Sequence, residues 1–453
     1  ETAVIAMDYT GKHAAVLGLG RSGEAAACLL LASGASVTVL DSGDPVPRRE
    51  AAGKLSSRGA RVVLGNDALC CAQEFDFAVL SPGINPVVPL ARRPVVAGIP
   101  LFGEIELAFR SCLCPVVAVT GTNGKTTTTG LIAALLDAAG IKAEACGNIG
   151  LPFSEVASRS GLLGAAVVEI SSFQLETTDV FRPRVAVWTN FSANHLDRYP
   201  DLASYRAAKL RIFDRQRAED FAVVNARAEL PALRARRMTF SALPGVEADF
   251  TLGAGDRIFY RGTPVLAMSE TRLRGPHNAE NLMAALGAGL CLGAGMEAML
   301  PAARAYVPPP HRGEFVREID GVTWINDSKS TNLDALSQAL RGQSGGVVLI
   351  AGGKNKGFGF APVADLVKER VRDAVLIGEM RDSIAGDWAQ VTSCHPADSL
   401  EEAVAQARAL ARPGDTVLFS PGTSSFDMFR SYEERGNIFR QLTQMIQPTN
   451  HIS

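Results

Sequence analysis

The sequence has no excess of charge of one sign and few aromatic side chains. Of its 453 residues, 45 are Lys or Arg and 47 are Asp or Glu, so the formal net charge is −2; aromatic residues make up 6%. No basic run with interleaved aromatic residues occurs. Bulk electrostatics therefore gives no reason to expect a nucleic acid or an acidic membrane as a partner.

Cysteines are few and scattered through the chain. The eight positions are Cys28, Cys70, Cys71, Cys112, Cys114, Cys146, Cys291 and Cys394. No Cys-x-x-Cys pair occurs, and the six histidines are not grouped with the cysteines at the spacing of zinc ligands. We therefore expect reduced, buried thiols of a cytoplasmic protein in place of disulfides or a metal cluster.

Long hydrophobic runs are also missing. The longest apolar stretch, residues 282–296, is rich in Gly and shorter than the ~18 residues that a membrane span needs. It predicts a tightly packed core helix. The start of the chain has no basic segment followed by an apolar stretch and a cleavage site, so no signal peptide is expected. These features predict a cytoplasmic protein.

The length of the chain suggests roughly three domains of ~150 residues each. Short, continuously apolar strands alternate with helical patterns, which is typical of α/β domains with mostly parallel sheets buried on both faces. We place the domains at residues 1–114, 115–308 and 309–453, with the triple proline 308–310 as the clearest boundary. The predicted strands are 14–17, 37–40, 61–64, 77–80, one ending at Thr120, 165–170, 185–190, 221–225, 322–325, 347–350, 374–377 and 416–419.

The most informative segment is residues 115–127, Pro-Val-Val-Ala-Val-Thr-Gly-Thr-Asn-Gly-Lys-Thr-Thr. A predicted strand leads into a glycine-spaced turn, and a helical pattern follows. Such a loop directs backbone N–H groups and the positive end of the helix dipole at a phosphate. Lys125 would contact the β and γ phosphates, and the Thr126 hydroxyl would hold Mg²⁺. The first glycine of the full motif is replaced by Val119, but the context predicts a nucleoside triphosphate site.

A second glycine turn, Gly18-Leu19-Gly20-Arg21-Ser22-Gly23, follows the first predicted strand, and Asp41 ends the next strand. This pattern is the dinucleotide fingerprint with an acidic ribose partner, so an NAD-dependent oxidoreductase is an alternative. Any diphosphate-linked ligand can use the same turn. The separate ATP loop favours a nucleotide-diphosphate substrate.

Three further side chains are candidates for the phosphate site. Glu169 ends a predicted strand, where P-loop proteins place an acidic residue that assists Mg²⁺ or positions a water; a helix-capping carboxylate is the alternative. His195 follows another strand end, although a lone loop histidine is more often structural. Lys209 lies in a helical segment, residues 205–211, whose composition indicates a solvated basic face.

These motifs resemble, in order, those of the Mur ligase family, the ATP-dependent amide-bond ligases that build the stem peptide of peptidoglycan. The ATP loop at residues 120–127 lacks the first Walker glycine, as the family's loop does. The resemblance covers nearly the whole chain; the other matching segments are 147–150, the Glu169 strand end, the His195 loop and 276–281. Segments 171–176, 205–209, 326–332, 420–427 and 435–436 resemble the members of the family that add D-glutamate.

The resemblance implies a Rossmann-like N-terminal domain, a central P-loop domain of the ATPase type and a Rossmann-like C-terminal domain. It also implies a reaction in the cytoplasm, in which ATP phosphorylates the alanyl carboxylate of UDP-N-acetylmuramoyl-L-alanine and the D-glutamate amine attacks the acyl phosphate. The first domain would bind the nucleotide sugar, the second the phosphates of ATP, and the third the amino acid and adenosine. We expect a monomer.

The resemblance implies roles for individual residues. Catalytic roles fall to Lys125, Glu169, His195, Lys209 and Lys329. Thr126 and Glu169 would hold one Mg²⁺, and His195 a second one supported by a carbamylated Lys209. ATP would be bound by Gly121, Thr122, Asn123, Gly124, Lys125, Thr126, Thr127, Asn278, Asn281, Arg312 and Asp327. The uridine diphosphate would be bound by Gly18, Arg21, Ser22, Asp41, Ser81, Pro82 and Gly83. Asn148, Ser171 and Gln174 would be further substrate contacts. D-Glutamate would be bound by Lys329, Thr331, Lys356, Ser425 and Tyr432, and Phe426 would be a further substrate contact.

The sequence departs from the family's pattern in two places. Position 432 is Tyr where members of the family often have Phe, and residues 353–356 lack the acidic residue that relatives often carry there.

Three alternatives stay open. Another Mur ligase or a folate-polyglutamate ligase would share the ATP loop. An NAD-dependent oxidoreductase would explain the Gly18 turn but not the Lys125 loop. A nucleotide-regulated binding module without turnover would need neither Glu169 nor His195 beside a metal.

Overall fold

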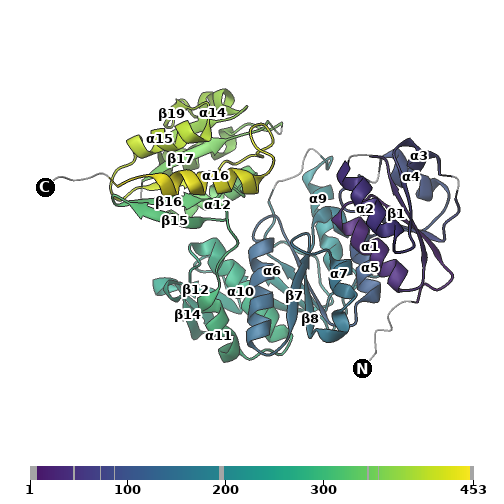
Figure 1. Ribbon diagram of the computed structural model, residues 1–453. Helices are drawn as coiled ribbons and strands as arrows, with labels where there is room; N and C mark the ends of the chain where they lie inside the picture. The colour runs from purple at the N-terminus through teal and green to yellow at the C-terminus, as the bar shows by residue number, and fades with distance from the viewer. Residues whose placement is uncertain are drawn as a thin grey trace. The chain divides into compact units, whose positions relative to one another are not determined.

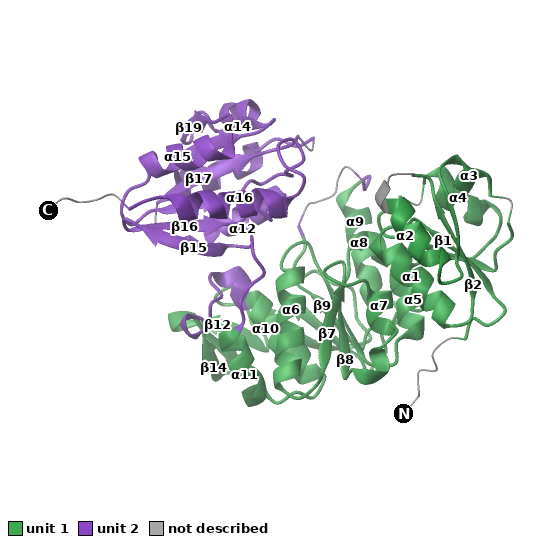
Figure 2. Ribbon diagram, in the orientation of Figure 1, with its two compact units in different colours: residues 1–191, 201–267, 280–305 green, residues 192–200, 268–279, 306–453 purple. Residues whose placement is uncertain are grey.

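The computed structural model describes residues 8–43, 46–71, 73–85, 87–192, 198–343, 346–355 and 357–448. The strands form three sheets, of five, nine and six strands (Figure 1). The chain divides into two compact units (Figure 2). The first contains residues 1–191, 201–267 and 280–305, and the second residues 192–200, 268–279 and 306–453. Among the residues described, no helix has both the length and the apolar character that crossing a membrane requires.

The five-stranded sheet opens the first unit, in the order β3-β2-β1-β4-β5, with all neighbours parallel. Its strands are β1 (His13–Leu17), β2 (Ser36–Asp41), β3 (Arg61–Leu64), β4 (Phe77–Leu80) and β5 (Leu101–Gly103). Alternate residues of β1 pack on opposite faces, Ala14 and Val16 on one and Ala15 and Leu17 on the other. Helices α1 (Arg21–Ala32), α2 (Val46–Ser56) and α5 (Glu104–Ser111) cover the first face, and α3 (Asn66–Cys70) and α4 (Pro89–Val96) the second.

The nine-stranded sheet has the order β14-β13-β12-β11-β10-β9-β6-β8-β7. It is parallel from β7 to β12 and antiparallel through β13 and β14. The strands are β6 (Val116–Thr120), β7 (Ala143–Gly147), β8 (Ala165–Glu169), β9 (Val185–Trp188), β10 (Phe221–Asn225), β11 (Arg236–Ser241), β12 (Phe250–Gly253), β13 (Arg257–Tyr260) and β14 (Thr263–Ala267). Because β8, β6 and β9 are neighbours, the residues that follow them meet at one edge.

Helices cover both faces of this sheet. These helices are α6 (Lys125–Ala138), α7 (Phe153–Ala157), α8 (Ser172–Leu175), α9 (Leu202–Leu210), α10 (Pro276–Cys291) and α11 (Met296–Ala305). All belong to the first unit except the start of α10, which belongs to the second unit up to Ala279. Phe153 of α7 and Leu175 of α8 pack with Ala118 and Ala222 on one face. On the other face, Gly287 of α10 lies against Val223, since a Cβ there would be 3.3 Å from its Cγ1.

The helix predicted over residues 282–296 is correct only up to Cys291. Gly293 adopts φ +85°, and the N–H groups of Gly293 and Ala294 donate to the carbonyls of Leu290 and Gly289. These two bonds are a Schellman C-cap, which needs a left-handed residue and therefore favours glycine. A separate helix, α11, starts at Met296.

The six-stranded sheet forms the core of the second unit, in the order β15-β16-β20-β17-β18-β19. Its strands are β15 (Glu314–Ile319), β16 (Val322–Asn326), β17 (Val347–Gly352), β18 (Val371–Ile377), β19 (Ser393–Pro396) and β20 (Thr416–Phe419). Only the β15–β16 pair is antiparallel. Helices α15 (Leu400–Leu410) and α16 (Tyr432–Met445) pack on one face, and α12 (Leu333–Arg341), α13 (Ala364–Arg370) and α14 (Arg381–Trp388) on the other.

Short 3₁₀ helices complete the chain: η1 (Ser160–Leu162), η2 (Arg211–Phe213), η3 (Ala254–Asp256), η4 (Met268–Glu270) and η5 (Ala361–Val363). The predicted α/β class with mostly parallel sheets is confirmed. The eight cysteines are free thiols, as predicted, but only Cys112, Cys114, Cys146 and Cys291 are buried. The expectation of buried thiols is therefore wrong for the other half of them. The domain boundaries near residues 114 and 308 stay a prediction.

Candidate active site

The phosphate loop, residues 121–124, joins β6 to α6 in the predicted strand–loop–helix arrangement. Gly121 and Gly124 have φ values of +146° and +79°. A Cβ at Gly121 would lie 2.0 Å from Thr189 Oγ1, and one at Gly124 would lie 2.2 Å from Asn281 Oδ1. Glycine is therefore required at both positions, for conformation and for space. The predicted ATP contacts Thr122, Asn123 and Thr127 stand on this loop and the first turn of α6.

Two residues that follow β9 fix this loop. The Asn123 N–H donates to Asn190 Oδ1 at 2.9 Å, and the Asn123 carbonyl accepts from Asn190 Nδ2 and Thr189 Oγ1 at 3.1 and 2.7 Å. The Thr122 N–H donates to the Asn190 carbonyl at 3.0 Å. The sequence pattern predicted Asn190 as the end of a strand but did not predict that it binds the phosphate loop. No motif or fixed spacing in the sequence marks an amide side chain that holds a loop in this way.

Lys125 and Lys209 both reach the Gly121 carbonyl oxygen. Lys125 Nζ donates to the carbonyls of Gly121 and Thr122 at 3.0 and 2.8 Å, and Lys209 Nζ donates to that of Gly121 at 2.8 Å. Lys209 is 2% exposed. The prediction from the composition of residues 205–211, that this lysine belongs to a solvated basic face, is therefore wrong. Burial, with Lys125 nearby, lowers the pKa of Lys209 well below its ordinary value, against the attraction of Glu169.

Glu169, at the end of β8, is almost fully buried beside the first turn of α6. Its Oε2 accepts from Thr126 Oγ1 at 2.7 Å, and its Oε1 accepts from Asn148 Nδ2 at 2.9 Å. The helix-capping alternative for Glu169 is not supported, because Ser171 caps α8 in a capping box with Gln174. The structure thus brings Lys125, Thr126, Glu169 and Lys209 to one loop.

The oxygen atoms of Thr126 and Glu169 fit the predicted Mg²⁺, since hard cations prefer hydroxyl and carboxylate oxygens. Within the described part of the chain, no three His, Cys, Asp or Glu side chains gather at the spacing of a metal site. The predicted second-metal ligand His195 and the predicted substrate residue Lys356 lie outside the described residues. Their roles stay predictions.

The glycine turn after β1 is organised by Asp41 and Ser81. Asp41 Oδ2 accepts from the Leu19 N–H at 2.7 Å, and its Oδ1 accepts from the Gly43 N–H at 2.8 Å. Ser81 Oγ donates to the Gly18 carbonyl at 3.1 Å. A Cβ at Gly23 would lie 1.9 Å from that carbonyl oxygen. Arg21 and Ser22, which open α1, and Pro82 and Gly83, which follow Ser81, lie at the same edge of the sheet.

The second unit gathers most of the remaining predicted residues after β16 and β20. Lys329 and Thr331 follow β16, Ser425 and Phe426 follow β20, and Tyr432 opens α16. Lys329 Nζ lies 3.6 Å from the centroid of the Tyr432 ring. Ser425 is buried, whereas Phe426 is 67% exposed.

Asp327 follows β16 directly and lies among polar neighbours. Its Oδ1 accepts from the Gly313 N–H at 3.0 Å, and its Oδ2 accepts from Ser420 Oγ at 2.8 Å. Burial raises the pKa of this carboxyl to about 7, although these hydrogen bonds favour the charged form. Asn278 and Arg312 also belong to the second unit, while Asn281 lies in the first. Their contact with ATP stays a prediction.

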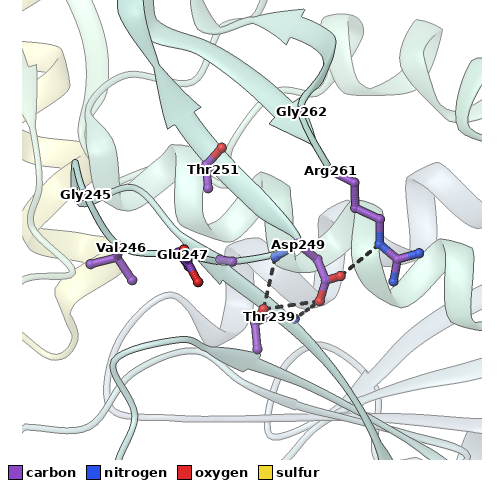
Figure 3. Close-up of a pocket in the computed structure, with 9 residues that line it drawn as sticks. Thr239, Gly245, Val246, Glu247, Asp249, Thr251, Arg261 and Gly262 are labelled. Atoms are coloured by element: carbon purple, nitrogen blue, oxygen red, sulfur yellow. Dashed lines mark hydrogen bonds and ion pairs between the residues drawn. The ribbon is translucent and has the colours of Figure 1, made fainter.

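A groove elsewhere on the first unit contains none of the predicted residues. It is lined by Thr239, Gly245, Val246, Glu247, Ala248, Asp249, Thr251, Arg261 and Gly262, on and around β11, β12 and β13 (Figure 3). Asp249 accepts from the Thr239 N–H at 2.9 Å and pairs with Arg261 at 2.9 Å. Since these polar groups satisfy one another, we do not assign the groove to the candidate site.

Comparison with known proteins gives consistent results. Residues 119–289 match the Mur ligase middle domain, and residues 311–422 match the Mur ligase glutamate ligase domain. Two curated relatives are named UDP-N-acetylmuramoylalanine--D-glutamate ligase. That of Geotalea uraniireducens is 41% identical, over 97% of this chain and 99% of its own. That of Syntrophotalea carbinolica is 42% identical, with the same coverage.

Solved structures of low sequence identity share the fold. The MurF ligase of Thermotoga maritima in complex with ADP matches with a TM-score of 0.61 and 15% identity, over 91% of this chain and 96% of its own. The UDP-N-acetylmuramate-alanine ligase of the same organism matches with a TM-score of 0.57 and 18% identity, over 96% and 99%. From the two domain matches and the full-length relatives, the chain belongs to the Mur ligase family.

Proposed function

We propose that the protein is an ATP-dependent ligase that joins D-glutamate to UDP-N-acetylmuramoyl-L-alanine in the cytoplasmic synthesis of peptidoglycan precursors. One observation carries the proposal. At the phosphate loop, Lys125 and Lys209 both donate to the Gly121 carbonyl, and beside them the Thr126 hydroxyl donates to Glu169. The curated relatives, at 41% and 42% identity, supply the substrate assignment through their names.

The chemistry requires activation, because a carboxylate and an amine do not condense at neutral pH. The γ-phosphoryl group of ATP passes to the alanyl carboxylate, giving an acyl phosphate and ADP. The D-glutamate nitrogen then attacks the carbonyl carbon, loses a proton, and phosphate leaves as the amide forms. Both steps bring anions together, so preorganised positive charge is the main requirement. The start of α6 and the side chain of Lys125 meet this requirement.

The donor atoms of Thr126 and Glu169 would hold one Mg²⁺, which offsets phosphate charge when bound. We place His195 and a carbamylated Lys209 near a second ion. The buried position of Lys209, whose Nζ contacts the phosphate loop, supports this assignment. An ammonium there would repel a metal ion, whereas a carbamate carries the charge of a carboxylate.

The glycine turn of the five-stranded sheet would hold the uridine diphosphate. Both carboxylate oxygens of Asp41 are engaged with backbone N–H groups, and Arg48 Nη1 lies 2.7 Å from Oδ1. The side chain therefore shapes the turn itself, and its presence needs no NAD ribose to explain it. In the second unit, we assign the D-glutamate contacts to the loops that carry Lys329 and Ser425.

The test is release of phosphate from ATP and Mg²⁺ in the presence of UDP-N-acetylmuramoyl-L-alanine and one amino acid at a time. We expect release that depends on D-glutamate, with the amide product identified by its mass. Lys125→Ala should abolish most of it, whereas Lys142→Ala, at an exposed lysine beyond α6, should not. Release with a different amino acid would refute the substrate assignment, and ATP binding without any release would favour a binding module.

A further inference from the structure

Arg435 places a fully buried guanidinium between two loops of the second unit. The residue lies on the first turn of α16 and is 0% exposed. Its Nε and Nη2 donate to Ser328 Oγ and the Ser328 carbonyl at 3.0 and 2.8 Å. Nη1 and Nη2 donate to the Thr423 carbonyl at 3.3 and 3.2 Å. One side chain thus bonds the loop after β16 and the loop after β20.

A third loop closes on the same guanidinium. Gly353 follows β17, which neighbours β20 in the sheet. A Cβ at Gly353 would lie 3.2 Å from Arg435 Nη1 and 2.4 Å from the Ser424 carbonyl oxygen. The Lys354 N–H donates to that carbonyl at 2.9 Å. Arg435 therefore lies where the loops after three adjacent parallel strands meet.

Residues of the proposed amino-acid subsite stand immediately beside these anchor points. Lys329 follows Ser328, and Ser425 lies two positions after Thr423. We propose that Arg435 is a positioning residue for the D-glutamate subsite: it fixes the loop that carries Lys329 against the loop that carries Ser425. This inference rests on the proposed function, and it goes beyond it by assigning the subsite's geometry to a residue that does not touch substrate.

The chemistry of arginine suits this role better than that of lysine. A buried charge costs several kcal/mol unless hydrogen bonds and opposite charges compensate it. Burial lowers the pKa of Arg435 only to about 10, with Asp427 and Asp327 opposing the shift, so the group stays charged at neutral pH. A planar guanidinium can serve two carbonyls and a hydroxyl at once, whereas an ammonium group lacks this fork.

Asp327, the predicted ATP contact on the loop after β16, is held by a different set of hydrogen bonds. Asp327 is held by the Gly313 N–H and by Ser420 Oγ, and its own N–H donates to the Phe419 carbonyl at 2.8 Å. None of these hydrogen bonds involves Arg435, which acts on Asp327 only through its charge. By contrast, Arg435 bonds Ser328 and Thr423 directly. Loss of Arg435 should therefore disturb Lys329 and Ser425 more than it disturbs Asp327.

The decisive variant is Arg435→Lys in the full chain, assayed after wild-type activity with D-glutamate has been established. We expect the KM for D-glutamate to rise at least about 10-fold, because small misplacements of binding groups have large effects. The KM for UDP-N-acetylmuramoyl-L-alanine should stay within about two-fold. Arg435→Met should show a larger effect; should Arg435→Met fail to fold, the lysine variant still decides.

Arg317→Lys is the matched control. Arg317 Nη1 donates to the Gln444 and Ile446 carbonyls at 2.8 and 3.4 Å, at the other end of α16. It should leave every KM unchanged. An unchanged KM for D-glutamate in folded Arg435→Lys, or an equal rise in all KM values, would overturn the inference. If the wild type itself shows no D-glutamate-dependent release, the proposed function fails first and the inference falls with it.

Discussion

The ammonium nitrogen of Lys329 lies 3.6 Å from the centroid of the Tyr432 ring. The electron-rich face of an aromatic ring attracts a cation and restricts where it lies. The Lys329 backbone is held as well, because its N–H donates to the His311 carbonyl at 3.0 Å. Because the contact uses the face of the ring, it does not depend on the phenol hydroxyl of Tyr432.

This contact predicts a difference between two substitutions of Tyr432. Tyr432→Phe keeps the ring and should keep the KM for D-glutamate within about two-fold. Tyr432→Leu removes the ring face and should raise that KM several-fold, the size expected for a cation–π contact of ~1 kcal/mol. Steady-state kinetics at saturating ATP measures both. An equal rise of the KM for D-glutamate in both variants would show that the phenol hydroxyl, and not the ring, is what matters. An unchanged KM in both variants would show that the contact does not contribute to D-glutamate binding.

The phosphate loop predicts that Lys125→Ala and Glu169→Ala each reduce turnover on the order of 10²-fold or more. Lys125 contributes positive charge at the loop. Glu169 Oε2 accepts a hydrogen bond from Thr126 Oγ1 at 2.7 Å. Phosphate release under saturating substrates is the measurement, with circular dichroism to confirm folding. Near-normal turnover in either variant would remove that residue from the mechanism.

Lys209 predicts an unusual form of rescue. If Lys209 acts as a carbamate, Lys209→Ala should lose activity and regain part of it when a short carboxylic acid is added. Removal of the side chain leaves space beside the Gly121 carbonyl, which Lys209 Nζ contacts at 2.8 Å. The same acid should not rescue Lys125→Ala. A folded Lys209→Ala protein that no acid restores would count against carbamylation.

Much of the fold is predictable because strands buried on both faces are continuously apolar. The ranges 61–64, 77–80, 221–225 and 416–419 match β3, β4, β10 and β20. Strands outside this pattern were missed. β12, β13 and β14, for example, form an antiparallel extension at one edge of the sheet, where polar residues and glycines hide the apolar pattern.

The site is predictable where a local motif carries it and not where distant segments meet. The phosphate loop needs glycines at fixed positions, so its geometry follows from residues 115–127. The burial of Lys209 depends on how α9 packs on a loop 88 residues away, which composition along one helix does not reveal. Arg435 bonds to Ser328 across 107 positions, and no spacing rule links the two.

Asp327 predicts a dependence of stability on pH. Burial raises its pKa from the ordinary 3.8 to about 7, so between these pH values the folded protein binds a proton that the unfolded chain does not. The protonated form stabilises the fold fully below about pH 4, and this contribution is lost as the pH rises through 7. Asp327→Asn removes the titration while one amide atom can still accept from Gly313 and the other can donate to Ser420.

Asp327→Asn should therefore gain stability relative to the wild type as the pH rises from 5 to 8, on the order of 1–3 kcal/mol. Thermal unfolding of the ligand-free protein at both pH values measures the difference. Asp365→Asn, at an exposed position on α13, is the control and should change by less than about 0.5 kcal/mol. A constant difference between wild type and Asp327→Asn would show that Asp327 stays ionised in the folded protein, with Arg312 and Arg435 compensating its burial.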